Sequence, residues 1–272
     1  ISTLKLKRKK ETDLILKWKN FFKKSKEDVN IAIVGKYFNT GDFILSDAYL
    51  SVIESLKYAG YKNKVNAKLS WLSSQDFESG KIPLSDLKKY QGVLIPGGFG
   101  STGVEGKIKV IQYLRENKIP FLGICYGMQL AVIEYTRSVL KLRDANTTEI
   151  DASTANPVID IQESQKANIS SGIYGNTMRL GNYECKVSKS TLLHNAYKSD
   201  NIVERHRHRY EVNNSYLSAL ESAGLVISGV NTKSNLVEAI ELPKSVHPFD
   251  VGVQYHPEFT SRPITSHPLF DS

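Results

Sequence analysis

A strand that turns abruptly into a helix at a cysteine between two glycines is the feature that most constrains this chain. The apolar run at residues 121–124 predicts a buried strand, and residues 128–135 have helix-forming composition. The sequence between them reads Gly123-x-Cys125-x-Gly127. Because the turn is tight, a Cβ atom at either glycine position would collide with the neighbouring strand or helix. The stretch therefore predicts an α/β unit with a thiol at the strand-to-helix corner.

The same corner gives Cys125 the surroundings of a nucleophile. A helix N-terminus carries partial positive charge and free N–H groups, which favour a thiolate over a thiol. The N–H of Tyr126, the next residue, is placed to face a developing oxyanion. The alternative is an inert buried cysteine, since free cysteines are among the most buried residues. The remainder of the chain decides between the two interpretations.

Apolar runs alternate with helical patterns through the first half of the chain, which favours an α/β fold. They predict strands at 29–34, 65–72 and 91–95, and helices at 47–60 and 107–117. The third strand leads into the glycine-rich loop 96–100, at the carboxyl end where open α/β sheets place ligands. Adjacent glycines let backbone N–H groups approach a substrate closely. A plain turn is the alternative, whereas a phosphate loop would need a Lys-Ser/Thr pair that is missing here.

The second half of the chain has a different pattern. We expect the helix after Cys125 to end near Arg143, and polar, irregular chain to follow over residues 144–176. The predicted elements beyond it are strands at 177–180 and 183–187, a helix near 216–223, and a hairpin of 225–230 with 236–242.

An alternating strand that begins at Asp250 ends at His256, and Glu258 lies two residues further on. Residues i and i+2 of extended backbone point the same way, so Glu258 can hold the imidazole in one tautomer. A lone histidine at a strand end is usually structural. A His-x-Glu at a strand's carboxyl end, downstream of a cysteine corner, favours a Cys–His–Glu triad.

The run Arg-His-Arg-His-Arg-Tyr at residues 205–210 suggests either nucleic-acid contact or a metal site. Its two histidines, His206 and His208, have no carboxylate or thiol cluster nearby in the sequence, which is a poor zinc pattern. We therefore expect no metal site.

Composition excludes several classes of protein. Only two cysteines occur in 272 residues, so a disulfide framework is excluded and a reducing, intracellular setting is indicated. Neither a secretory signal nor an apolar run of about 18 residues is present. The net charge of +8 raises nucleic-acid binding as an alternative, but much of the excess lies in residues 1–28 without a recognisable binding module. That segment is expected to be a basic linker followed by an amphipathic helix bearing Trp18 and Phe21.

Together the motifs resemble the class I, or triad, glutamine amidotransferases. They are residues 96–100, 123–129 and 256–258. Three further stretches are similar to the CTP synthase family in particular: 175–181, 205–213 and 256–263. The resemblance covers roughly residues 29–272. It implies a Rossmann-like three-layer α/β sandwich with a central, mostly parallel sheet, acting as a glutamine amidotransferase domain that hydrolyses L-glutamine to glutamate and ammonia.

The resemblance also implies roles for individual residues. Cys125 matches the nucleophile that forms a γ-glutamyl thioester, His256 the base, and Glu258 the partner that orients it. The N–H groups of Gly98 and Tyr126 match the oxyanion hole. The implied substrate-binding residues are Gly98, Phe99, Tyr126, Gln129, Glu149 and Arg209. A carboxylate suits the ammonium group of glutamine and a guanidinium suits its carboxylate, while solvated surface charge is the alternative for both residues.

In the family, ammonia passes to an N-terminal synthetase domain, where UTP is aminated to CTP with ATP and magnesium. That domain is missing from this sequence, so residues 1–28 are expected to be the tail of the interdomain linker. The resemblance implies no cofactor in the amidotransferase domain, GTP as an allosteric activator, a homotetramer at full length, and a cytoplasmic location. Nucleic acid and membrane are not expected partners.

Two positions depart from the family pattern. Tyr126 follows the nucleophile where leucine is usual, and Thr102 precedes Gly103 where an arginine associated with GTP stimulation is usual. We expect the chemistry to survive the first change, because the backbone donor is kept. GTP activation is expected to be weakened or carried by other groups. A non-catalytic regulatory or assembly module remains the alternative function.

Overall fold

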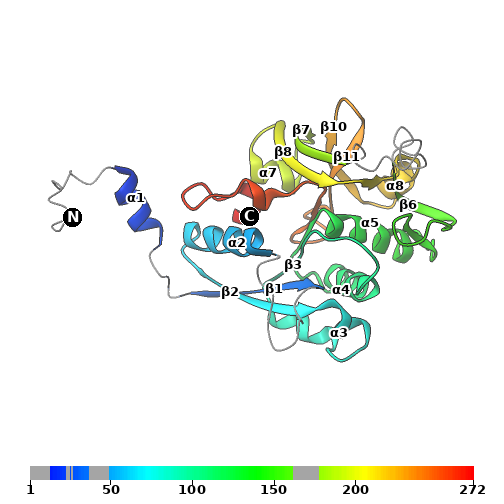
Figure 1. Ribbon diagram of the computed structural model, residues 1–272, viewed down its shortest axis with the longest axis horizontal. Helices are drawn as coiled ribbons and strands as arrows, with labels where there is room; N and C mark the ends of the chain where they lie inside the picture. The colour runs from blue at the N-terminus through cyan, green and yellow to red at the C-terminus, as the bar shows by residue number, and fades with distance from the viewer. Residues whose placement is uncertain (1–12, 23–24, 26, 37–48, 162–177) are drawn as a thin grey trace.

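A nine-stranded sheet runs through the described part of the chain (Figure 1). The computed structural model describes residues 13–22, 25, 27–36, 49–161 and 178–272. In spatial order the strands are β2 (Asn66–Ser73), β1 (Asp28–Gly35), β3 (Gly92–Ile95), β4 (Phe121–Ile124), β12 (Asp250–Val253), β11 (Leu236–Glu241), β10 (Val226–Asn231), β7 (Arg179–Val187) and β8 (Asn201–His208).

The first five strands in that order are parallel to one another, and the last four pair antiparallel. The middle parallel strands are continuous apolar runs because both of their faces are covered. In β1, for example, Ala32 and Val34 belong to the buried cluster on one side of the sheet, and Ile33 belongs to the cluster on the other side. The α/β class and the layered arrangement predicted from the sequence are confirmed.

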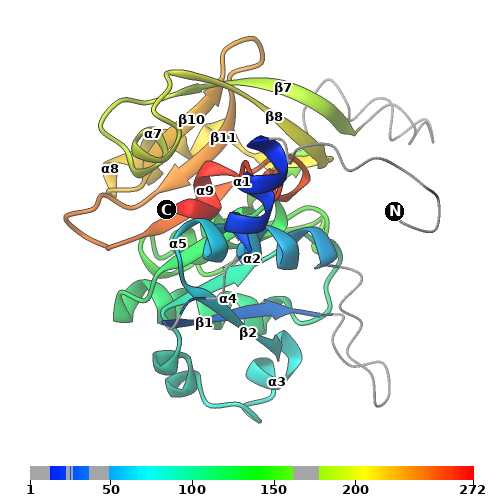
Figure 2. The same cartoon turned by 90° about the vertical axis from the view of Figure 1, so that its left-hand side faces the viewer.

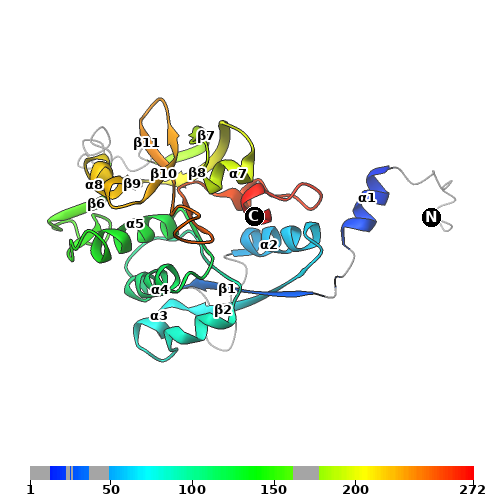
Figure 3. The ribbon, with the colours of Figure 1, turned by 180° about the vertical axis from the view of Figure 1, so that it is seen from behind.

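Helices form the two outer layers. They are α2 (Leu50–Lys62), α3 (Ser74–Glu78), α4 (Val104–Asn117), α5 (Tyr126–Ser138), α7 (Leu192–Tyr197), α8 (Leu217–Ser222) and α9 (Pro268–Asp271). Figure 2 shows α2 and α3 on opposite sides of β1 and β2. Seen from behind in Figure 3, α4 and α5 lie together, and the two helices pack against each other. Among the described residues, no helix combines the length and apolar character needed to cross a membrane.

The prediction of irregular chain over residues 144–176 is wrong where the structure describes it. Strand β5 (Ala145–Thr147) pairs with β6 (Asn156–Ile161), which pairs with β9 (Tyr210–Val212), in a small separate sheet. These strands are short and partly polar, so their pairing with chain about 50 residues away leaves no periodic pattern to detect. The sheet matters for the site because Glu149 follows β5 directly.

Other elements begin or end at residues different from those predicted. The strands expected at 177–180 and 183–187 form the single strand β7, and Thr177 lies outside the described residues. The nucleophile helix, expected to reach Arg143, ends at Ser138. Helix α2 extends to Lys62, and the start predicted for it at Asp47 also lies outside the described residues. The predicted hairpin is present as β10 and β11.

Helix α1 (Asp13–Phe21) forms where an amphipathic helix was predicted, but none of its residues is buried. It lies to one side of the sheet in Figure 1. Its contact with the main body is aromatic: the rings of Phe21 and Phe22 lie 5.8 and 5.1 Å from that of Tyr61 on α2. Trp18 packs on Phe22 at 4.9 Å and stays half exposed. The interpretation of residues 1–28 as an interdomain linker stays a prediction.

The close packing of β3 against the start of α5 yields a stability prediction. A Cβ atom at Gly127 would lie 2.2 Å from the backbone oxygen of Ile95. We expect Gly127→Ala to lower the free energy of unfolding by about 2–3 kcal/mol, because a backbone atom cannot move aside as a flexible side chain can. At Gly92 the nearest atom to such a Cβ is 3.7 Å away, so Gly92→Ala is the matched control. Urea unfolding of both variants measures the difference, and equal losses would contradict it.

Candidate active site

Cys125 lies at the corner between β4 and α5 in a backbone conformation that L-residues rarely adopt, with φ 51° and ψ −102°. Such strain persists only where the surrounding structure enforces it, and it is common at functional sites. Here the Cys125 N–H donates to Val253 O at 2.7 Å, and its carbonyl accepts from Gln129 N at 3.1 Å. Since α5 begins at Tyr126, the N–H groups of its first turn have no intrahelical partner and face the region above the sulfur.

His256 follows β12, and Glu258 lies beside it. The His256 Nδ1 and Glu258 Oε1 atoms are 2.7 Å apart, and Phe259 stacks on the imidazole with ring centroids 4.9 Å apart. Because Nδ1 is occupied by the carboxylate, Nε2 is the nitrogen left to face Cys125. Burial by itself lowers the pKa of His256, but the contact with the Cys125 sulfur and the bond to Glu258 together raise that pKa to about 10. The arrangement favours the protonated, imidazolium form of His256 beside the Cys125 sulfur.

The glycine loop after β3 lies against both reactive groups. A Cβ atom at Gly97 would be 2.8 Å from His256 Cε1 and 3.6 Å from Cys125 Cβ. Backbone of this loop can therefore approach a substrate held between sulfur and imidazole, which a side chain at Gly97 would prevent. Gly98 is the next residue along, and it lines the same cavity.

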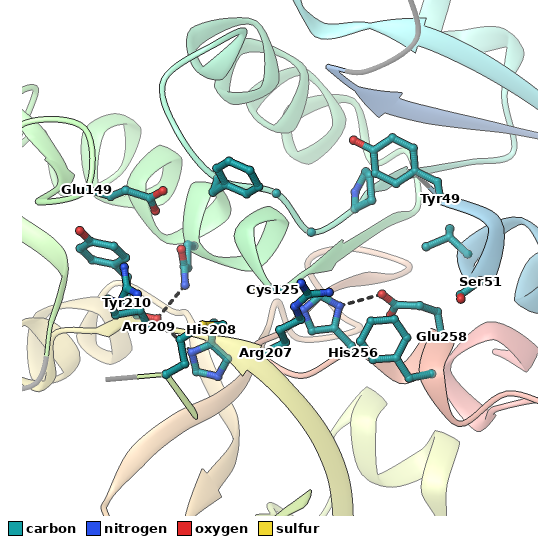
Figure 4. A pocket seen from close by; sticks show the side chains of 18 of the residues that line it. Tyr49, Ser51, Cys125, Glu149, Arg207, His208, Arg209, Tyr210, His256 and Glu258 are labelled. Atoms are coloured by element: carbon teal, nitrogen blue, oxygen red, sulfur yellow. Dashed lines mark hydrogen bonds and ion pairs between the residues drawn. The ribbon is translucent and has the colours of Figure 1, made fainter. Parts of the chain in front are cut away.

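A cavity of about 540 Å³ opens at these residues (Figure 4). It is lined by most of the residues expected in the site: Gly98, Phe99, Cys125, Gln129, Glu149, Arg209, His256 and Glu258. Phe99 is 66% exposed and lies at the rim. Tyr126 differs from the expectation for a substrate-binding side chain. Its ring is buried outside the cavity, and the oxyanion role of its backbone N–H stays a prediction.

Charged and amide groups occupy the part of the cavity away from Glu258, where Figure 4 shows Glu149 with Arg209 and Tyr210. Glu149 Oε1 accepts the Gly100 N–H at 2.8 Å. Burial raises the pKa of Glu149, against the opposing effects of that N–H, Lys36 and Arg209. Gln129 uses its amide nitrogen within the protein, since Nε2 donates to Tyr210 O at 2.8 Å and to Gln254 Oε1 at 3.2 Å.

Gln254 is a site residue that the sequence reasoning missed. Its Nε2 donates to the Cys125 sulfur at 3.7 Å, and its carboxamide oxygen accepts from Gln129. The only signal in the sequence was its position two residues before His256. The first turn of α2, from Leu50, also lines the cavity and was not expected there.

His206 and His208, left without a role by the sequence, are buried in strand β8, and His208 also lines the cavity. His208 Nδ1 lies 3.2 Å from Tyr210 O, which can only accept, so His208 Nε2 accepts from His206 Nδ1 at 2.8 Å. Burial, the largest cause, lowers the pKa of both imidazoles, and both are neutral. The pair thereby holds the Tyr210 carbonyl to which Gln129 donates.

Three charged side chains complete this buried cluster. Arg179 bonds Glu238 at 2.6 Å and Glu211 at 3.3 Å. Burial raises the pKa of Glu211 to about 8, so near neutral pH it keeps a proton and one arginine balances one carboxylate. Although carboxylates and imidazoles lie close here, no grouping able to hold a metal ion occurs among the residues that the structure describes.

Comparison with known proteins agrees with this geometry. The profile of the glutamine amidotransferase class-I family matches residues 44–272. The CTP synthase of Caldanaerobacter subterraneus subsp. tengcongensis is 48% identical over 256 residues, which are 93% of this chain and 46% of that protein. The CTP synthase of Clostridium kluyveri is 50% identical over 248 residues, covering 91% and 44%. The chain thus spans a little under half the length of these relatives.

A solved structure agrees as well. The glutaminase domain of Trypanosoma brucei CTPS, with bound acivicin, superposes with a TM-score of 0.81 at 35% identity, over 89% of this chain and 91% of that one. The chain belongs to the class-I glutamine amidotransferases. Within them, it belongs with the glutaminase domains of the CTP synthase family.

The ion pair at His256 makes a prediction about pH. We expect Glu258→Gln to lower the pKa of His256 by about one unit or more, because the imidazolium loses its negative partner. A raised histidine pKa stabilises the fold fully below the ordinary value of 6.5, and this stability is lost as pH rises through about 10. In the variant the loss comes at lower pH. NMR titration of the imidazole measures the shift, with the exposed Glu105→Gln as control. An unchanged His256 titration in Glu258→Gln would contradict the assignment.

Proposed function

We propose that this chain hydrolyses L-glutamine to glutamate and ammonia, with Cys125, His256 and Glu258 as its catalytic triad. One observation carries the proposal: a thiol at a strained strand-to-helix corner contacts an imidazole whose other nitrogen is bonded to a buried carboxylate. That arrangement supplies an activated nucleophile, a proton carrier and a group that orients it. Membership of the class-I family supports glutamine as the substrate.

In the first half-reaction the Cys125 thiolate attacks the carboxamide carbon and forms a carbon–sulfur bond. The carbonyl oxygen becomes an oxyanion, which the N–H groups of Gly98 and Tyr126 stabilise. His256, charged and held by Glu258, then gives its proton to the amide nitrogen. The carbon–nitrogen bond breaks, ammonia leaves, and a γ-glutamyl thioester remains on the sulfur.

In the second half-reaction His256 is neutral and takes a proton from water. The resulting hydroxide attacks the thioester carbon, and the same N–H groups hold the new oxyanion. The carbon–sulfur bond breaks and restores the thiolate beside a protonated imidazole. Glutamate leaves as a carboxylate after its acid proton passes to solvent.

The head group of glutamine is placed by charge. Glu149 offers a carboxylate to the substrate ammonium, and Arg209 offers a guanidinium to the substrate carboxylate. Both residues line the cavity, and the charge of Arg209 acts to lower the pKa of Glu149. Gln129, which lines the cavity, is held by its hydrogen bonds to Tyr210 and Gln254. Phe99 covers the aliphatic part of the substrate at the rim. This set selects an α-amino acid whose side chain reaches Cys125.

In our proposal, the ammonia is consumed by a second domain. The relatives are named CTP synthases and are about twice as long as this chain. We infer that a synthetase domain of the same longer protein aminates UTP to CTP with ATP and magnesium. A homotetramer, a cytoplasmic location and GTP as activator, weakened by Thr102, belong to the same proposal.

The nucleophile is tested by Cys125→Ala and by acivicin. Glutamate release from glutamine falls below about 10⁻³ of the wild-type rate in the variant, because no thioester can form. Acivicin modifies Cys125 and leaves Cys185 unmodified, since burial raises the pKa of the Cys185 thiol far above neutrality. Mass spectrometry of the labelled chain locates the adduct. Glutamate release by Cys125→Ala at the wild-type rate would end the proposal, and labelling confined to Cys185 would favour a non-catalytic module.

The head-group assignment is tested at Arg209. We expect Arg209→Met to raise KM for glutamine about tenfold or more with a smaller change in kcat, because a charge-assisted bond made in both ground and transition states is lost. Arg205→Met is the matched control, since Arg205 is an exposed arginine of strand β8, just before Arg209, that does not line the cavity. Steady-state glutamate release gives both constants. Equal KM increases in the two variants would contradict the role of Arg209.

A further inference from the structure

Both backbone polar groups of Gly100 are hydrogen-bonded to residues of the site. Its N–H donates to Glu149 Oε1 at 2.8 Å, and its carbonyl accepts from the Tyr126 hydroxyl at 2.8 Å. Gly100 ends the glycine loop that carries Gly98, and Tyr126 follows the nucleophile directly. Gly100, through the two peptide groups that flank its Cα, therefore connects the loop, the nucleophile helix and a carboxylate of the cavity.

The tyrosine ring makes a second contact with the same loop. A Cβ atom at Gly98 would lie 3.6 Å from Tyr126 Cδ1, so the ring packs directly behind that residue. Lys107 of α4 packs beside both, with its Nζ 5.3 Å from the ring centroid and 3.9 Å from that Cβ position. Both side chains are 1% exposed. The ring cannot turn away without opening this packing, so the hydroxyl stays directed at Gly100.

We propose that the Tyr126 side chain is a positioning residue that holds the glycine loop in register with the nucleophile helix. It fixes the Gly98 N–H relative to the Tyr126 N–H, the two donors that must meet one oxyanion. The inference rests on the proposed glutamine hydrolysis and adds a role for a side chain outside the cavity. Leucine, which lacks a donor, could not make this bond.

The protonation state of the Tyr126 hydroxyl agrees with a hydrogen bond to Gly100 that persists across pH. Burial raises the pKa of Tyr126, so the hydroxyl remains a proton donor across the working pH range. The two hydrogen bonds hold the adjacent peptide groups on either side of the Gly100 Cα. Glu149 is therefore bonded to the backbone of the glycine loop, and the position of the head-group carboxylate is coupled to that of the loop.

Tyr126→Phe tests the role, because it keeps the ring and removes only the hydroxyl. We expect kcat for glutamine hydrolysis to fall about tenfold with KM within about twofold, because the loop donor acts in the transition state rather than in ground-state binding. The rate of Cys125 alkylation by iodoacetamide stays unchanged, since that reaction needs the thiol but no oxyanion hole. Tyr126→Leu, which also loses the ring packing on Gly98, is slower still.

Tyr135→Phe is the matched control. Tyr135 lies on the same helix, and its hydroxyl donates to Ala223 O at 2.7 Å, remote from the cavity. It removes a bond of the same kind, so its loss of stability should resemble that of Tyr126→Phe while its kcat stays at the wild-type value.

The outcomes separate the two proposals. A wild-type chain that hydrolyses no glutamine and is not labelled at Cys125 overturns the proposed function. An active wild type with undiminished kcat in Tyr126→Phe, or in Tyr126→Leu if the first variant does not fold, overturns the positioning role alone. Equal loss of kcat in Tyr126→Phe and Tyr135→Phe, or slowed alkylation in Tyr126→Phe, assigns the effect to general destabilisation and overturns it too.

Discussion

The parallel pairing of β4 with β12 is the interaction on which the site depends. The register places Ile124 opposite Val253, so the residue after one strand and the residues after the other emerge at the same edge of the sheet. Cys125 donates its N–H to Val253, and Gln254, 129 positions away, reaches its sulfur. A shift of one residue in this register would turn the imidazole or the thiol to the other face. Close packing of the glycines around the corner keeps that register.

Around this pairing, many polar groups of the site are hydrogen-bonded to other groups of the protein. His206 and His208 hold the Tyr210 carbonyl, which holds Gln129. Both the N–H and the carbonyl of Gly100 are hydrogen-bonded. Preorganised groups of this kind need little rearrangement when charge develops on the substrate, which is the main way in which proteins stabilise oxyanions. These hydrogen bonds hold the residues around Cys125 in place. Phe99, at the rim of the cavity, is exposed.

Local chemistry made much of this predictable. The glycines on both sides of Cys125 could be predicted because steric exclusion acts within a few residues. The contact of His256 with Glu258 is present, but the extended strand expected to carry it is wrong, since β12 ends at Val253 and Glu258 lies in the 3-10 turn Pro257–Phe259. The small sheet of β5, β6 and β9 was not predictable, since its polar strands pair with distant chain. The same reason hid the burial of His206 and His208, whose carboxylate partners lie on β9 and β11. The boundary between residues 1–28 and the domain stays a prediction.

What the sequence by itself determined is the α/β class, the position of the strand-to-helix corner, and the residue types able to carry nucleophilic chemistry. These follow from local sterics and periodicity, which do not depend on contacts with distant segments of the chain. Only the tertiary structure decided that Tyr126 points behind Gly98 instead of into the cavity, that Gln254 contacts the thiol, and that one arginine bonds two buried glutamates. Each of these is a contact between segments far apart in the chain, and its free energy depends on burial that exists only once the sheet has formed.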